Sequence, residues 1–98
     1  MESYPVSNTA SAVVSIPNKL GLHARPAMIF VEAASKLKSD VTVKRCDQDD
    51  IVDGKSIMQM MMLAATQGTE IQIDATGSDA DEAVKTLVSL VKSGFQED

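Results

Sequence analysis

The sequence has few of the residues on which several classes of protein depend. It contains no tryptophan, one tyrosine and two phenylalanines, so platforms on which nucleic acid bases could stack are absent. Nine basic residues are outnumbered by fourteen acidic ones and are scattered along the chain, which gives a formal charge of −5. Binding to a phosphate backbone needs a basic stripe. We therefore expect no nucleic acid partner.

Cysteine and long apolar runs are equally scarce. The single cysteine, Cys46, rules out an internal disulfide and a metal site built on several thiolates, and we expect it to be partly buried and without a chemical role. No stretch approaches the roughly 20 apolar residues of a membrane span, and residues 1–11 lack the basic and apolar regions of a signal peptide. We expect a cytoplasmic protein with no membrane insertion, no metal and no cofactor.

The residues that are present suit one small globular domain. The 98 residues are 44% apolar and 23% charged, which is a globular composition. A chain of this length buries only roughly 60–65% of its unfolded surface, so any chemistry is expected at the surface rather than in a deep interior. The small, unpatterned residues 1–10 are predicted to be a flexible leader, and residues 11–98 a single domain.

Hydrophobic periodicity divides that domain into seven elements. Alternating or β-branched runs predict strands at residues 11–16, 41–45, 51–53 and 70–75, of which the middle two form a hairpin. Apolar residues at steps of three and four predict amphipathic helices at residues 24–36, from 57 to 63 or beyond, and from 79 to about 92. This order predicts an α+β two-layer sandwich of split βαβ type, with three helices on one face of a four-stranded sheet.

Capping residues set the predicted ends of the later helices. Ser56 is suited to cap the second helix, with Gln59 completing a capping box and Gly68 closing the helix. Ser78 is the predicted N-cap of the third helix, whose first turn carries the acidic residues that the helix dipole favours.

The most informative stretch is residues 21–27, Gly-Leu-His-Ala-Arg-Pro-Ala, at the entry to the first helix. Pro26 suits a first helical turn, where its missing N–H would have no partner, and this places His23 at or just before the helix N-terminus. Backbone N–H groups without intrahelical acceptors and the positive end of the helix dipole make this place an anion site. Gly21 allows the loop a conformation closed to other residues.

Two interpretations of His23 fit this spacing. In one, the imidazole only caps the helix. In the other, it attacks a phosphorus atom, after which the backbone N–H groups and the Arg25 guanidinium bind the phosphoryl oxygens. A lone histidine does not by itself establish catalysis, so the spacing leaves both interpretations open.

Residues 21–27, followed by Phe30, Val31 and Ala34, resemble the active-site signature of the HPr family, the histidine-containing phosphocarriers of the bacterial phosphoenolpyruvate-dependent phosphotransferase system. The resemblance extends over about residues 12–95. It implies an open-faced β-sandwich of four antiparallel strands covered by three helices, in agreement with the predicted order of elements. It also implies a protein that carries a phosphoryl group and is not an enzyme.

The resemblance assigns roles to four residues of the signature. It implies that His23 accepts a phosphoryl group on Nδ1 from enzyme I and passes it to an enzyme IIA. Arg25 is then the clamp on the phosphoryl group, and Gly21 and Ala24 belong to the loop that supports it.

Other segments also resemble the family, with some departures. Residues 54–58 look like its regulatory serine segment, which makes Ser56 a target for HPr kinase/phosphorylase, and residues 78–95 fit its last helix. The chain departs from the sugar-system pattern in a longer leader, in extra length around residues 47–50, and at residues 63–65. Sugar uptake and its regulation is the expected role. A nitrogen-related regulatory branch, acting through phosphorylation-dependent protein binding, is the alternative.

The second helix holds more apolar residues than one core-facing stripe can use. Met60 and Leu63, three positions apart, are the predicted core pair. The others, with one residue of the first helix, are predicted to form an exposed partner-binding patch beside the active site: Met28, Ile57, Met58 and Met61. The alternative is that all of them belong to a methionine-rich core.

Two other classes of function stay open on the residues alone. One is a regulatory module whose partners respond to phosphorylation of His23 or Ser56 without onward transfer. The other is a small ligand-binding or assembly domain in which His23 only caps a helix. In each case we expect a monomer.

Overall fold

The computed structural model describes residues 8–96, and the strands and helices follow the predicted order. The elements are β1 (Thr9–Ser15), α1 (Ala24–Ser35), β2 (Asp40–Arg45), β3 (Ile51–Asp53), α2 (Ile57–Met62), β4 (Glu70–Thr76) and α3 (Ala80–Lys92). Among the described residues, no helix is long and apolar enough to cross a membrane.

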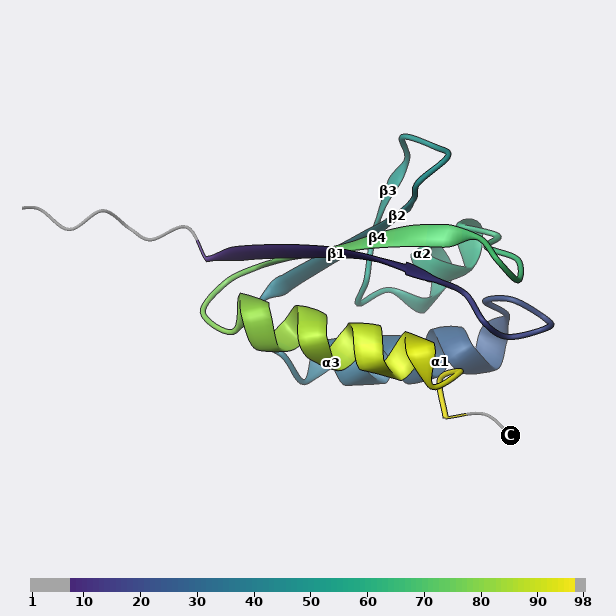
Figure 1. Ribbon diagram of the computed structural model, residues 1–98. Helices are drawn as coiled ribbons and strands as arrows, with labels where there is room; N and C mark the ends of the chain where they lie inside the picture. The colour runs from purple at the N-terminus through teal and green to yellow at the C-terminus, as the bar shows by residue number, and fades with distance from the viewer. Residues whose placement is uncertain (1–7, 97–98) are drawn as a thin grey trace, which may run out of the picture.

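The four strands form one antiparallel sheet in the order β1-β4-β2-β3. Helices α1 and α3 lie side by side against one face of this sheet, and α2 packs against α1 and β3 (Figure 1). Over residues 8–96 the opposite face of the sheet carries no helix. The predicted α+β open-faced sandwich is confirmed, and so is the β2–β3 hairpin.

The core lies between the sheet and the helices because the apolar periods of both kinds of element face the same layer. On β4, Ile71, Ile73 and Ala75 alternate with polar residues and are buried. From the other side of the layer, Phe30 of α1 and Leu87 of α3 are fully buried. A sheet with one buried face leaves its loops and helix ends at the surface, where a partner can reach them.

The first strand begins earlier than the sequence predicted. Thr9 and Ala10, the last residues of the predicted leader, pair with Thr76 and Ala75 of β4 and belong to the sheet. Backbone pairing with β4 extends the strand although these side chains carry no strong strand pattern. Residues 1–7 of the predicted leader lie outside the described residues.

The end of α2 is also different from the prediction. The helix stops at Met62, and Ala64 has a left-handed backbone with φ +51°, so Gly68 does not close it. Gly68 instead lies in the turn before β4, where its N–H donates to the carbonyl of Ile16 at 2.8 Å. The short helix therefore leaves residues 63–69 as a loop that runs back toward the start of α1.

The predicted capping box at the start of α2 is only half formed. The Ser56 hydroxyl accepts from the Gln59 N–H at 3.2 Å, as expected of an N-cap. The Gln59 side chain, however, accepts from the Asp53 N–H at 2.9 Å rather than from Ser56. This bond occupies an N–H group of the edge strand β3, a partner that helix periodicity does not reveal.

Two residues have surroundings other than those predicted. Asp79 rather than Ser78 is the N-cap of α3, and its carboxylate accepts from the Ser39 hydroxyl and from the N–H groups of Lys38 and Ser39, each N–H at 2.9 Å. These bonds, the hydroxyl bond foremost, lower the pKa of the Asp79 carboxyl and tie the α1–β2 turn to α3. Cys46 is exposed rather than partly buried, because it follows the last residue of β2.

Candidate functional site

His23 stands at the N-cap of α1, in the loop that joins β1 to this helix. Its backbone is extended, with φ −87° and ψ −170°, and its carbonyl accepts the first hydrogen bond of the helix from the Ala27 N–H at 3.0 Å. Within the described chain its imidazole makes no capping hydrogen bond to the helix. The predicted position of His23 is confirmed, and the interpretation that its side chain only caps the helix is wrong.

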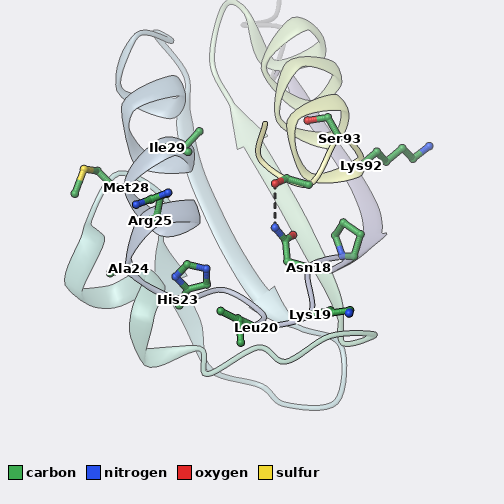
Figure 2. Close-up of a pocket in the computed structure, with 12 residues that line it drawn as sticks. Asn18, Lys19, Leu20, His23, Ala24, Arg25, Met28, Ile29, Lys92 and Ser93 are labelled. Carbon is green, nitrogen blue, oxygen red and sulfur yellow. Dashed lines mark hydrogen bonds between the residues drawn. The ribbon is translucent and has the colours of Figure 1, made fainter. Parts of the chain in front are cut away.

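The first turn of α1 presents backbone donors next to His23. The N–H groups of Ala24 and Arg25 precede the first residue that can find an intrahelical acceptor, and the buried Pro26 has no N–H. The positive end of the helix dipole lies at the same place. Arg25 is exposed, on the same side of the cleft as His23 (Figure 2). Together these groups form a surface suited to bind an anion beside the His23 imidazole.

Gly21 shapes the loop in front of His23. Its φ of +70° is left-handed, and a Cβ at this position would lie 2.4 Å from the Ala65 carbonyl oxygen and 2.9 Å from the Thr66 Cα. The next N–H, that of Leu22, donates to the same Ala65 oxygen at 2.8 Å. The predicted need for glycine is confirmed, and its cause is the close approach of the chain that follows α2.

His23 and Arg25 line an open cleft of about 1,050 Å³ between the first loop and the end of α3. Figure 2 shows Lys92 across this cleft from them. Asn18 joins the two sides, because its Nδ2 donates to the Gly94 carbonyl at 2.9 Å. The sequence analysis missed this wall of the site, since Asn18 and Gly94 are 76 positions apart and no local pattern connects them. Among residues 8–96, no group of three or more His, Cys, Asp or Glu side chains could hold a metal ion.

The second set of predicted site residues is on or near α2. Met60 is 0% exposed and Leu63 3%, so the predicted core pair is confirmed. Met58, by contrast, is 79% exposed, and the interpretation that the whole helix belongs to a methionine-rich core is wrong. All predicted patch residues are exposed, and we call them the methionine patch: Met28, Ile57, Met58 and Met61.

The methionine patch borders the His23 cleft. Met28 lines the cleft itself, and α1, which carries Met28, packs against α2. Two further exposed apolar side chains were missed by the sequence analysis, Leu20 in the cleft and Met62 on α2. Met62 follows Met58 by one helical turn, so the same spacing argument applied to it could have found it.

Comparison with known proteins identifies the family. The model described as the PTS HPr component phosphorylation site matches residues 10–93. The phosphocarrier protein HPr of Neisseria meningitidis is 46% identical over 84 residues, which is 86% of this chain and 92% of that protein. The phosphocarrier protein NPr of Escherichia coli is 36% identical over 90 residues, 92% of this chain and 99% of that protein.

Solved structures agree with this assignment. HPr from Thermoanaerobacter tengcongensis matches with a TM-score of 0.83 and 43% identity, covering 91% of this chain and 98% of that one. HPr from Bacillus anthracis matches with a TM-score of 0.78 and 37% identity, covering 85% and 96%. The site at the start of α1, the fold and these similarities together show that the chain belongs to the HPr family of phosphocarrier proteins of the phosphotransferase system.

Proposed function

We propose that His23 accepts a phosphoryl group on Nδ1 from phosphorylated enzyme I and passes it to an enzyme IIA. The observation that supports this most directly is the position of the only histidine of the chain, at the N-terminus of α1 beside helix donors and an exposed arginine. Enzyme I and enzyme IIA are the partners that membership of the family implies. In this role the protein is a carrier and not a catalyst.

The residues around His23 supply what such a transfer needs. The His23 nitrogen lone pair attacks the phosphorus while the bond from phosphorus to the phosphohistidine nitrogen of enzyme I breaks, so the phosphoryl group is passed from one imidazole to another. The N–H groups of Ala24 and Arg25, together with the Arg25 guanidinium, bind the phosphoryl oxygens. Gly21 keeps the loop closed against the chain that follows α2. The site holds its charge-binding groups in place before the donor arrives, which lowers the barrier to transfer.

The methionine patch is the proposed surface for the protein partners. Its four side chains, Met28, Ile57, Met58 and Met61, are exposed and so have no role in the core, and Met28 also lines the cleft. Unbranched, polarizable methionines adapt to surfaces of different shape. One small patch can in this way serve a donor and an acceptor in turn.

Ser56 is proposed as a regulatory site, phosphorylated by an HPr kinase/phosphorylase. It caps α2 and is partly exposed, and the next two residues, Ile57 and Met58, belong to the methionine patch. A phosphate there adds about −1.5 to −2 charges. Burying that charge against a partner is costly, so phosphorylation of Ser56 is expected to slow docking rather than to unfold the protein.

The protein is proposed to serve the sugar-uptake branch of the phosphotransferase system, and the nitrogen-related branch is the second candidate. HPr proteins reach 46% identity with this chain, whereas an NPr protein at 36% identity extends over 99% of its own length. Transfer from phosphorylated protein to a sugar-system enzyme IIA, compared with transfer to a nitrogen-type enzyme IIA, distinguishes the two. Faster transfer to the nitrogen-type acceptor would overturn the sugar assignment.

The protein is proposed to act as a monomer. Among solved relatives, a Thermoanaerobacter tengcongensis HPr is described as a dimer, and Crh of Bacillus subtilis as an intertwined, domain-swapped one. Sedimentation of the phosphorylated and unphosphorylated protein tests this. A dimer in both states would contradict the proposal.

The decisive experiment is incubation with phosphoenolpyruvate and enzyme I. Wild-type protein should take up one phosphoryl group that is lost in acid and kept in base, as expected of a phosphoramidate. His23→Ala should accept none while keeping its fold, which circular dichroism checks. Undiminished labelling of that variant would overturn the proposed function.

A further inference from the structure

Arg45, the last residue of β2, reaches across to the end of α2. Its Nη1 donates to the carbonyls of Leu63 and Ala64 at 3.3 and 3.2 Å. Helix ends leave such carbonyls without intrahelical donors, and a basic side chain in the last turn often satisfies them. The last turn of α2 contains no basic residue. A cation from a different element therefore completes the end of this short helix.

Asp47 holds the Arg45 guanidinium in the orientation that this requires. Its Oδ1 accepts from Nε at 3.0 Å and its Oδ2 from Nη2 at 2.8 Å, which is a bidentate pair. The hydrogen bonds from Arg45 lower the pKa of the Asp47 carboxyl, so the carboxylate stays ionised to a more acidic pH than an ordinary one. With two nitrogens held by Asp47, the third points at the carbonyls after α2.

The chain after α2 connects these carbonyls to the His23 loop. The carbonyls of Leu63 and Ala64 accept from Arg45, and the next carbonyl, that of Ala65, accepts from the Leu22 N–H at 2.8 Å. Leu22 directly precedes His23. Leu63 and Ala65 are each 3% exposed, so this stretch has little room to shift without disturbing the core. Three consecutive carbonyls thus connect Arg45 to the residue before the nucleophile.

We propose that Arg45, oriented by Asp47, is a positioning residue for His23. It fixes the chain at Leu63–Ala65, which in turn fixes Leu22 and the loop that presents the imidazole. The inference rests on the proposed function, because it concerns the rate at which His23 is phosphorylated. It also predicts a structural effect that can be measured without any phosphoryl donor.

The geometry needs an arginine and not merely a positive charge. An exposed ion pair contributes little by itself, and lysine has a single nitrogen that cannot contact Asp47 and two carbonyls in a fixed plane. Arg45→Lys is therefore expected to resemble Arg45→Ala. Lys44 is the matched control, since it is the neighbouring cation of β2 and alternation turns it to the opposite face of the sheet.

The test compares wild type, Arg45→Ala and Lys44→Ala in two assays. In amide hydrogen exchange, Arg45→Ala should accelerate exchange of the Leu22 N–H by about tenfold and leave that of Ile73, in the centre of β4, unchanged. With the Arg45→Ala variant as the substrate of enzyme I, the kcat of phosphorylation should fall by roughly tenfold, with the KM for the variant little changed. This loss is smaller than the one that a 1 Å misplacement can cause. Lys44→Ala should match wild type in both assays.

The outcomes separate this inference from the proposed function. Equal acceleration at Leu22 and Ile73 would show a general loss of stability and overturn the inference, as would an unchanged Leu22. A wild-type protein that accepts no phosphoryl group would overturn the proposed function, while the Leu22 exchange would still decide the structural connection. Should Arg45→Ala not fold, Asp47→Ala is the second variant. It should show the same selective acceleration at Leu22, and its absence would overturn the role of the pair.

Discussion

Replacing Gly21 by alanine places a methyl group against the chain that follows α2. The new Cβ would lie 2.4 Å from the Ala65 carbonyl oxygen and 2.9 Å from the Thr66 Cα. Both are backbone atoms, so no change of rotamer relieves the contact. The φ of +70° adds a second cost, because alanine disfavours the left-handed region.

Gly68→Ala separates the two costs. Gly68 also has a positive φ, +87°, but a Cβ there would meet nothing within 4 Å in the described structure. The conformational cost alone is about 1–2 kcal/mol, and crowding of a packed region adds typically about 1–3 kcal/mol. We therefore expect Gly21→Ala to lower the free energy of unfolding by about 2–4 kcal/mol and Gly68→Ala by about 1–2 kcal/mol.

Urea unfolding followed by far-UV circular dichroism measures this difference, since the chain has no tryptophan for fluorescence. Enzyme I-dependent labelling adds the functional measurement. Gly21→Ala should slow labelling of His23, because it opposes the bond from the Leu22 N–H to the Ala65 oxygen, whereas Gly68→Ala should label normally. Equal losses of stability for both variants, with normal labelling of both, would refute this account of the loop.

Four further predictions concern other parts of the site and the fold. Arg25→Ala should fold normally, and quench-flow measurements should show its phosphoryl exchange slowed by about 10- to 100-fold, the loss expected for one charge-assisted contact. An unchanged rate would show that the backbone donors suffice. Met58→Glu should weaken enzyme I binding by about tenfold or more in calorimetry, with a nearly unchanged melting temperature, because the side chain is 79% exposed; a large loss of stability would contradict its surface position. Ser56→Asp should keep the fold but slow labelling of His23, whereas Ser56→Ala should lose about 1 kcal/mol of stability as a missing cap and label normally; a Ser56→Asp protein that labels at the wild-type rate would leave Ser56 a cap alone. Because the pKa of Asp79 is lowered in the folded protein, its contribution to stability is complete above the ordinary carboxyl value of 3.8 and is lost as the pH falls through the lower folded value. The midpoint of urea unfolding, measured down to pH 2, should therefore fall less steeply for Asp79→Asn than for wild type.

The centre of the candidate site could be predicted from a short stretch of sequence. Pro26 and Gly21 restrict the backbone on either side of His23, and those restrictions act within a few residues. The same holds for Ser56, whose hydroxyl bonds to an N–H three positions away. Local constraints of this kind place a residue at a helix end whatever the rest of the chain does.

The walls and supports of the site could not be predicted in this way. Arg45 contacts a carbonyl 18 positions away, and Asn18 one that is 76 positions away. Nothing near Arg45 or Asn18 in the sequence distinguishes these partners from other carbonyls. They became partners only when the sheet and helices had packed and brought two loops together.

The sequence by itself determined which segments are strands and helices and which face of each is buried, because apolar periods of two and 3.6 residues depend only on near neighbours. It also determined the place of His23 at a helix N-terminus. The tertiary structure alone decided that α2 ends at Met62, that the Asp79 carboxylate binds the α1–β2 turn rather than an N–H of the helix whose N-cap position it occupies, and that Gly21 lies against Ala65. Each of these depends on which distant backbone groups are within hydrogen-bonding or van der Waals distance, and only the packing of the whole chain sets those distances.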